Sequence, residues 1–114
     1  MKIDVRLQED PRLVLGIKGA LDRHGARKLS RFLLHRDQRG FVDLELDLAA
    51  VDFIGLSAIA TLHELCHSLS QRGGSLSLRN VSAILKGALD CLGKAPCWKV
   101  QNPDQQSLNK DPGG

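Results

Sequence analysis

Aromatic residues are scarce in this sequence. There is no tyrosine and a single tryptophan, and aromatic residues make up only 4% of the 114 positions. Proteins that bind single-stranded nucleic acids stack bases on aromatic side chains, so the sequence disfavours this class of function. The net charge of +3 at pH 7 is also below the basic excess of a dedicated nucleic-acid-binding domain. We therefore expect no nucleic-acid partner.

Long apolar runs are missing as well. The longest uninterrupted stretches cover a few residues, far short of the roughly 18 needed to cross a bilayer. The first residues, 1–6, alternate charged and apolar side chains and do not form the apolar centre of a signal peptide. These features predict a cytoplasmic protein with no direct membrane insertion.

Cysteine is limited to three residues, at positions 66, 91 and 97. A small, odd number argues against a disulfide framework and fits a reducing compartment. We expect Cys66 in the core and Cys91 and Cys97 as reduced thiols; the alternative is a disulfide between these two, which are six residues apart. The motifs C-x-x-C, G-x-G-x-x-G and G-x-x-x-x-G-K-[ST] are absent too, so we expect no cofactor.

Two hydrophobic periodicities alternate along the chain. Period-two patterns predict strands near residues 2–7, 13–18, 42–48, 75–79 and 97–100, and helical patterns predict helices over 23–36, 57–72 and 83–92. Gly19 is expected to interrupt the second strand. Ser82 is expected to cap the third helix, whose apolar stripe includes Ile84.

This order of elements predicts one α/β domain over residues 1–101, with a mixed sheet of four to five strands and helices mainly on one face. Leu44, Leu46 and Leu48 alternate strictly with acidic residues, which indicates one covered and one wet face of the sheet. Residues 102–114 are polar and rich in proline and glycine, which predicts a mobile tail.

Three stretches together resemble a known family. They are Gly19-Ala20-Leu21-Asp22 before the first helix, residues 46–54 (LDLAAVDFI) and residues 72–82 (RGGSLSLRNVS). Their order and spacing resemble the STAS domain, the fold of bacterial anti-sigma factor antagonists and of related domains in anion transporters. The resemblance covers about residues 2–101. It implies a protein-binding domain and no enzymatic activity.

The resemblance departs from the family at the regulatory position. Partner-switching members carry Asp-Ser-Ser-Gly-Leu there, and a serine in it accepts a phosphate. The matching residues here are Gly55-Leu56-Ser57-Ala58-Ile59, so only the second serine is kept. Ser57 is thus the phosphorylation candidate, and its alternative role is the N-cap of the second helix. Leu56 is either an exposed contact for a partner or a side chain tucked under the helix.

The partner surface implied by the resemblance consists of Asp22, His24, Gly55, Leu56, Ser57 and Thr61. Asp22 has an alternative structural role as the cap of the first helix. The implied partner is a GHKL-type kinase that acts as an anti-sigma factor. The alternative is an accessory subunit of a larger assembly such as a lipid-transport ABC complex. Asp47 is expected to orient a turn before Val51.

Two further patterns compete with this interpretation. Residues 63–67 match H-E-x-x-H, the zinc-protease motif, but no histidine or glutamate follows His67 to supply a third ligand. We expect no metal site there and an exposed histidine pair. The first helix carries five basic residues, which we interpret as a solvated face, or as a contact for an acidic protein in preference to DNA. They are Arg23, Arg27, Lys28, Arg31 and Arg36.

Overall fold

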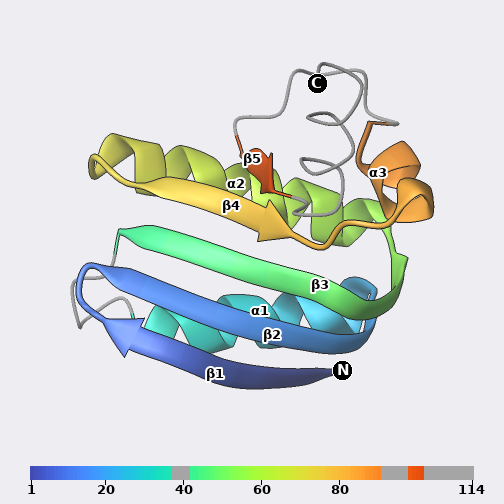
Figure 1. Cartoon of the computed structure of the whole chain (residues 1–114), viewed down its shortest axis with the longest axis horizontal. Helices are drawn as coiled ribbons and strands as arrows, with labels where there is room; N and C mark the ends of the chain where they lie inside the picture. The colour runs from blue at the N-terminus through green and yellow to red at the C-terminus, as the bar shows by residue number, and fades with distance from the viewer. Residues whose placement is uncertain (37–41, 91–97, 102–114) are drawn as a thin grey trace, which may run out of the picture.

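The computed structural model describes residues 1–36, 42–90 and 98–101 (Figure 1). Its elements are β1 (Lys2–Glu9), β2 (Arg12–Leu21), α1 (Arg23–Arg36), β3 (Asp43–Ile54), α2 (Leu56–Gln71), β4 (Ser75–Arg79), α3 (Ala83–Leu89) and β5 (Lys99–Gln101). The strands form one sheet in the order β1-β2-β3-β4-β5. Strands β1 and β2 are antiparallel, and the other neighbours are parallel. The predicted mixed α/β sheet is confirmed.

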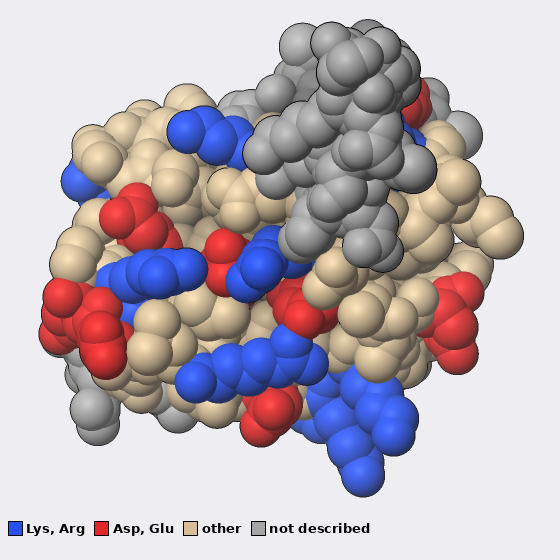
Figure 2. Space-filling view, viewed as in Figure 1, with Lys and Arg blue, Asp and Glu red and all other residues tan. Residues whose placement is uncertain are grey.

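The helices α1 and α2 cover one face of this sheet and leave the other face open. In Figure 1 both helices lie behind the strands. Leu44, Leu46 and Leu48 of β3 point into the core and are at most 2% exposed. The open face carries acidic and basic side chains next to one another (Figure 2). The alternation in β3 therefore predicted the covered and open faces correctly.

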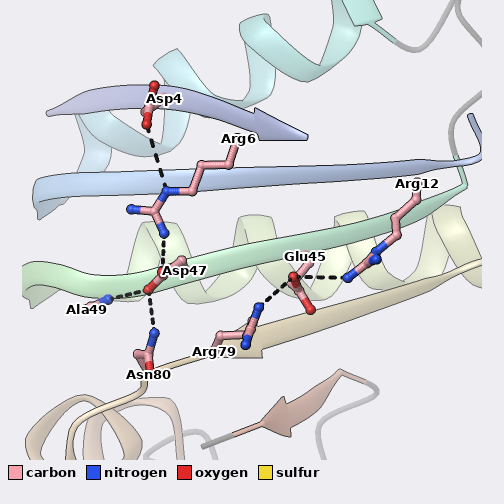
Figure 3. A network of polar contacts seen from close by, with 8 residues as sticks. All are labelled: Asp4, Arg6, Arg12, Glu45, Asp47, Ala49, Arg79 and Asn80. Atoms are coloured by element: carbon pink, nitrogen blue, oxygen red, sulfur yellow. Dashed lines mark hydrogen bonds and ion pairs between the residues drawn. The ribbon is translucent and has the colours of Figure 1, made fainter. Parts of the chain in front are cut away.

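Glu45 and Asp47 organise the open face, and both are paired. Glu45 lies 3.3 Å from Arg79 and 3.6 Å from Arg12. Asp47 accepts hydrogen bonds from Arg6 and from the side chain of Asn80 (Figure 3). The charges of this face are thus largely satisfied within the chain.

Strand β3 is longer than predicted, because it continues past Leu48 through a bulge. Its register against β2 pairs Gly16 with Asp47 and then Lys18 with Ala50, so β3 carries one extra residue at this point. The N–H of Ala49 donates to Oδ1 of Asp47 at 3.0 Å. Asp47 does bond the local backbone, but the prediction of a turn was wrong, because the bulge lets the strand continue.

Strand β2 also continues where an interruption was predicted. Gly19 has a φ of +103°, which glycine adopts without the steric penalty of a Cβ. Opposite Gly19 and Ala20 a second register shift places another extra residue in β3, between Val51 and Phe53. Strand β2 therefore continues through Gly19, and Leu21 at its end is buried.

Two glycines end α2, as predicted. Gly73 has a φ of +80°, and the N–H of Gly74 donates to the carbonyl of Leu69 at 2.8 Å. A Cβ on Gly74 would lie 1.8 Å from the carbonyl oxygen of Val42. Only glycine therefore lets the chain pass Val42 and enter β4 beside β3.

Helix α3 confirms one prediction and corrects another. The N–H of Leu85 donates to Oγ of Ser82 at 3.2 Å, so Ser82 is the N-cap. Ile84 is 84% exposed, so its assignment to the apolar stripe was wrong. The buried pair is Leu85 and Leu89, at helical spacing i, i+4. The predicted helix end at 92–93 lies outside the described residues.

Cys66 lies in the core, as predicted, but it is disulfide-bonded. The sequence did not predict this bridge: an odd cysteine count argues against a disulfide framework but does not exclude a single disulfide. Cys91, Cys97 and the predicted tail at 102–114 lie outside the described residues. Within the described part of the chain, no helix is long and apolar enough to cross a membrane.

Candidate functional site

The N-termini of α1 and α2 lie close together at the carboxyl ends of β2 and β3. Both helices start at the right-hand end of the sheet in Figure 1. The N–H of Gly55 donates to the carbonyl of Leu21 at 3.0 Å, and a Cβ on Gly55 would lie 3.9 Å from Cα of Asp22. We call Asp22, Phe53, Gly55, Leu56 and Ser57 the corner.

Asp22 caps α1, as its alternative role predicted. The N–H of Gly25 donates to Oδ1 of Asp22 at 2.9 Å. This hydrogen bond, with a smaller effect of the neighbouring His24, holds the pKa of Asp22 below its ordinary value. His24 is exposed in the first turn of α1. Asp22 is therefore a structural carboxylate that stays ionised at the rim of the corner.

Leu56 and Phe53 form the apolar part of the corner. Leu56 is 66% exposed, so the interpretation of a side chain tucked under the helix is wrong. Phe53 is 53% exposed, and its ring packs beside Gly55, where a Cβ would lie 3.3 Å from Cε2. Sequence reasoning missed Phe53 as a surface residue, because the predicted strand ended at residue 48, whereas β3 continues to Ile54.

Ser57 is exposed and does not cap α2. The N-cap is Gly55, with φ −102° and ψ 170° and no side-chain hydrogen bond. The prediction of a Ser57 cap was wrong because the helix begins one residue earlier, at Leu56. Ser57 is thus the second helical residue, and its carbonyl accepts a hydrogen bond from Oγ1 of Thr61 at 3.0 Å.

Ser57 and Thr61 border a groove between α1 and α2. The groove measures about 390 Å³, and its α1 side carries Arg23, Arg27 and Arg31. The sequence placed these arginines on the first helix but gave no sign of what lies opposite. The structure therefore brings the phosphorylation candidate and the basic helix face to one groove.

The two histidines of the H-E-x-x-H motif have different surroundings. The ring of His63 lies against Trp98, with centroids 4.5 Å apart and planes inclined by 51°. His63 is therefore partly buried, and the prediction that it is exposed was wrong. His67 is exposed, and its Nε2 lies 3.2 Å from Nε2 of Gln71. Among the described residues, no three His, Cys, Asp or Glu side chains gather to hold a metal.

Comparison with known proteins identifies the family. The family described as "Mlab, STAS domain" matches residues 5–94. The chain therefore belongs to the STAS domain family, as the resemblance in its sequence indicated. No curated protein matches the chain.

Solved structures with the same fold include three informative relatives. The anti-sigma factor antagonist SpoIIAA in its unphosphorylated form is 14% identical, with a TM-score of 0.70 over 99% of this chain and 100% of that chain. RsbS of Moorella thermoacetica is 19% identical, with a TM-score of 0.72 over 96% and 94%. A sulfate transporter family protein of Wolinella succinogenes is 25% identical, with a TM-score of 0.64 over 77% and 71%. These similarities show the fold.

Proposed function

We propose that this STAS domain is a protein-binding regulatory domain of the anti-sigma factor antagonist type, and that the corner is its docking surface. The observation that carries the proposal is the exposure of Leu56 and Phe53 beside the Asp22 cap. Two large apolar side chains at one edge, surrounded by polar groups, are typical of a protein contact. Hydrogen bonds from Gly55 to Leu21 and from Gly25 to Asp22 fix the backbone of the corner, so a partner meets a defined surface.

The partner we propose is a kinase-like anti-sigma factor of the GHKL type. The shared fold with the anti-sigma factor antagonist SpoIIAA supports this choice. A related structure shows the Bacillus cell fate determinant SpoIIAA in a phosphorylated form. In this chain the hydroxyl of Ser57 is exposed and free of a capping role, so it is accessible to a kinase. A phosphate there would add about −1.5 to −2 charges to the corner and alter docking.

The second candidate is a constitutive accessory subunit of a larger assembly, such as a lipid-transport ABC complex. It is favoured by Gly55 and Leu56, which stand where partner-switching members carry an acid and a serine. The exposed Leu56 supplies an apolar contact that needs no phosphate. Both candidates use the same docking surface and differ in the partner and in the use of Ser57.

Site-specific photo-crosslinking in the cells that produce the protein tests the docking surface. A p-benzoylphenylalanine in place of Phe53 is expected to give a covalent adduct with another protein. The same residue in place of Val100, on the distant strand β5 and 37% exposed, is the control and should give none. Adducts from position 100 alone would contradict the proposal. The identity of the captured protein separates the kinase from the ABC assembly.

A further inference from the structure

The groove beside Ser57 continues along the whole contact between α1 and α2. Its first part, of about 390 Å³, and a second part of about 270 Å³ share Ser30 and Thr61 as lining residues. The second part runs towards the C-terminal ends of both helices and reaches Leu34 and Leu65. The two parts together form one groove that extends away from the corner.

The first part of the groove is strongly basic. Arg23, Arg27 and Arg31 follow one another at a spacing of four residues, which places them on one side of α1. All three are exposed, and within the described residues none forms an ion pair. Helix α1 contains no acidic residue. This row therefore presents unneutralised positive charge to whatever enters the groove.

The second part of the groove is mainly apolar: the buried Leu33 and Leu69 line it, and exposed Glu64, Ser68 and Arg72 line it towards the α2 side. Leu34 is 70% exposed although it lies on a helix that packs against the core. Leu65, opposite it on α2, is partly buried against the core. The groove thus changes from basic to mainly apolar along its length. A small inorganic anion would contact only the basic part.

We propose that this groove binds an acidic segment of the partner protein. The segment places carboxylates against Arg23, Arg27 and Arg31 and an apolar side chain against Leu34. The inference rests on the proposed function, because its occupant belongs to the protein that docks at the corner. A second copy of this chain fits less well, since Glu45 and Asp47 on its open face are already paired with its own arginines.

Selection from a library of random peptides tests the groove without knowledge of the partner. Peptides selected on the purified protein are expected to be rich in Asp and Glu and to contain an apolar residue near one end of the acidic run. The affinity of the best peptide is then measured by fluorescence anisotropy. Arg27→Glu should weaken it about tenfold or more, because it replaces attraction by like-charge repulsion. Higher salt should weaken it too, because the charges are exposed.

Lys99→Glu is the matched control, because it makes the same charge change on exposed β5. It should leave the affinity within about twofold, since exposed charges beyond about 10 Å are screened. Selected peptides without acidic enrichment, or peptides that bind Arg27→Glu as well as the wild type, would overturn the proposal. The proposal would also be overturned if the wild type sedimented as a dimer and Arg27→Glu as a monomer, because the groove would then bind a second copy of the chain.

The two proposals fail separately in these experiments. Leu56→Ser removes the apolar contact of the corner without adding charge beside the arginine row, so it should retain peptide binding. Crosslinking at position 53 together with failed peptide selection overturns the groove alone. Peptide binding at the groove without a crosslink at position 53 overturns the corner alone.

Discussion

The N–H of Gly55 donates a hydrogen bond to the carbonyl oxygen of Leu21 at 3.0 Å, which joins the start of α2 to the end of β2. This bond connects two segments that are more than thirty residues apart in the sequence and brings Asp22 beside Gly55. The residue that makes the bond is also the N-cap of α2. Because Gly55 takes that position, Leu56 and Ser57 fall in the first helical turn and stay exposed.

Replacement of two serines distinguishes a helix cap from a surface hydroxyl. Ser82→Ala removes the bond to the N–H of Leu85 and should lower the free energy of unfolding by about 1 kcal/mol. Ser57→Ala removes no capping bond and should change it by less than about 0.5 kcal/mol. Urea unfolding monitored by circular dichroism measures both. A Ser57→Ala cost equal to that of Ser82→Ala would contradict the position of the helix start.

Two glycines should respond in opposite directions to alanine. A Cβ on Gly74 would collide with the carbonyl oxygen of Val42 at 1.8 Å, so Gly74→Ala should destabilise the protein by about 2 kcal/mol or more. A Cβ on Gly87 in α3 would meet no atom within 4 Å, so Gly87→Ala should stabilise it by about 0.5–1 kcal/mol. Thermal unfolding of both variants checks this. Equal effects would argue against the close approach at Gly74.

The stability of the fold should depend on pH through Asp47. Burial alone would raise the pKa of Asp47, but hydrogen bonds from Asn80, the N–H of Ala49 and Arg6 outweigh it and hold the pKa below its ordinary value. A carboxyl group with a lowered folded-state pKa stabilises the fold above its unfolded pKa of about 3.9, and this contribution is lost as the pH falls through the folded value.

Asp47→Asn should therefore reduce stability near pH 7 and flatten its decline below about pH 4. Chemical unfolding over a series of acidic buffers measures this slope. If the slope of the variant equals that of the wild type, Asp47 does not carry this part of the acid sensitivity.

Phosphorylation at Ser57 is a direct prediction of the partner-switch candidate. Incubation with the captured kinase and ATP should add one phosphate, and mass spectrometry should locate it on Ser57. Ser57→Ala should abolish the modification and leave the fold intact. A phosphate on another residue would contradict the role of Ser57, and an unmodified protein would favour the accessory-subunit candidate.

The sequence predicted most elements because local patterns determine them. The alternation of Leu44, Leu46 and Leu48 predicted the covered face, and Ser82 predicted its helix start. The bulge after Asp47 was not predictable, because it depends on how β3 pairs with β2. Features of the site that depend on contacts between distant elements were missed for the same reason.

The corner and the groove illustrate this limit. Preference for serine as an N-cap suggested Ser57, whereas the bond from Gly55 to Leu21 sets the actual start. That shift exposes Leu56. The arginines of α1 were visible in the sequence, but only the packing of α1 against α2 shows that Arg27 faces a groove.

The affinity of the captured partner for Leu56→Asp tests the central claim most directly. Burial of a leucine at an interface contributes about 1.5–3 kcal/mol, so the variant should bind at least about tenfold more weakly in calorimetry. Lys99→Gln, which changes the net charge equally on β5, should bind like the wild type. If Leu56→Asp is folded and binds with wild-type affinity, the corner is not the docking surface.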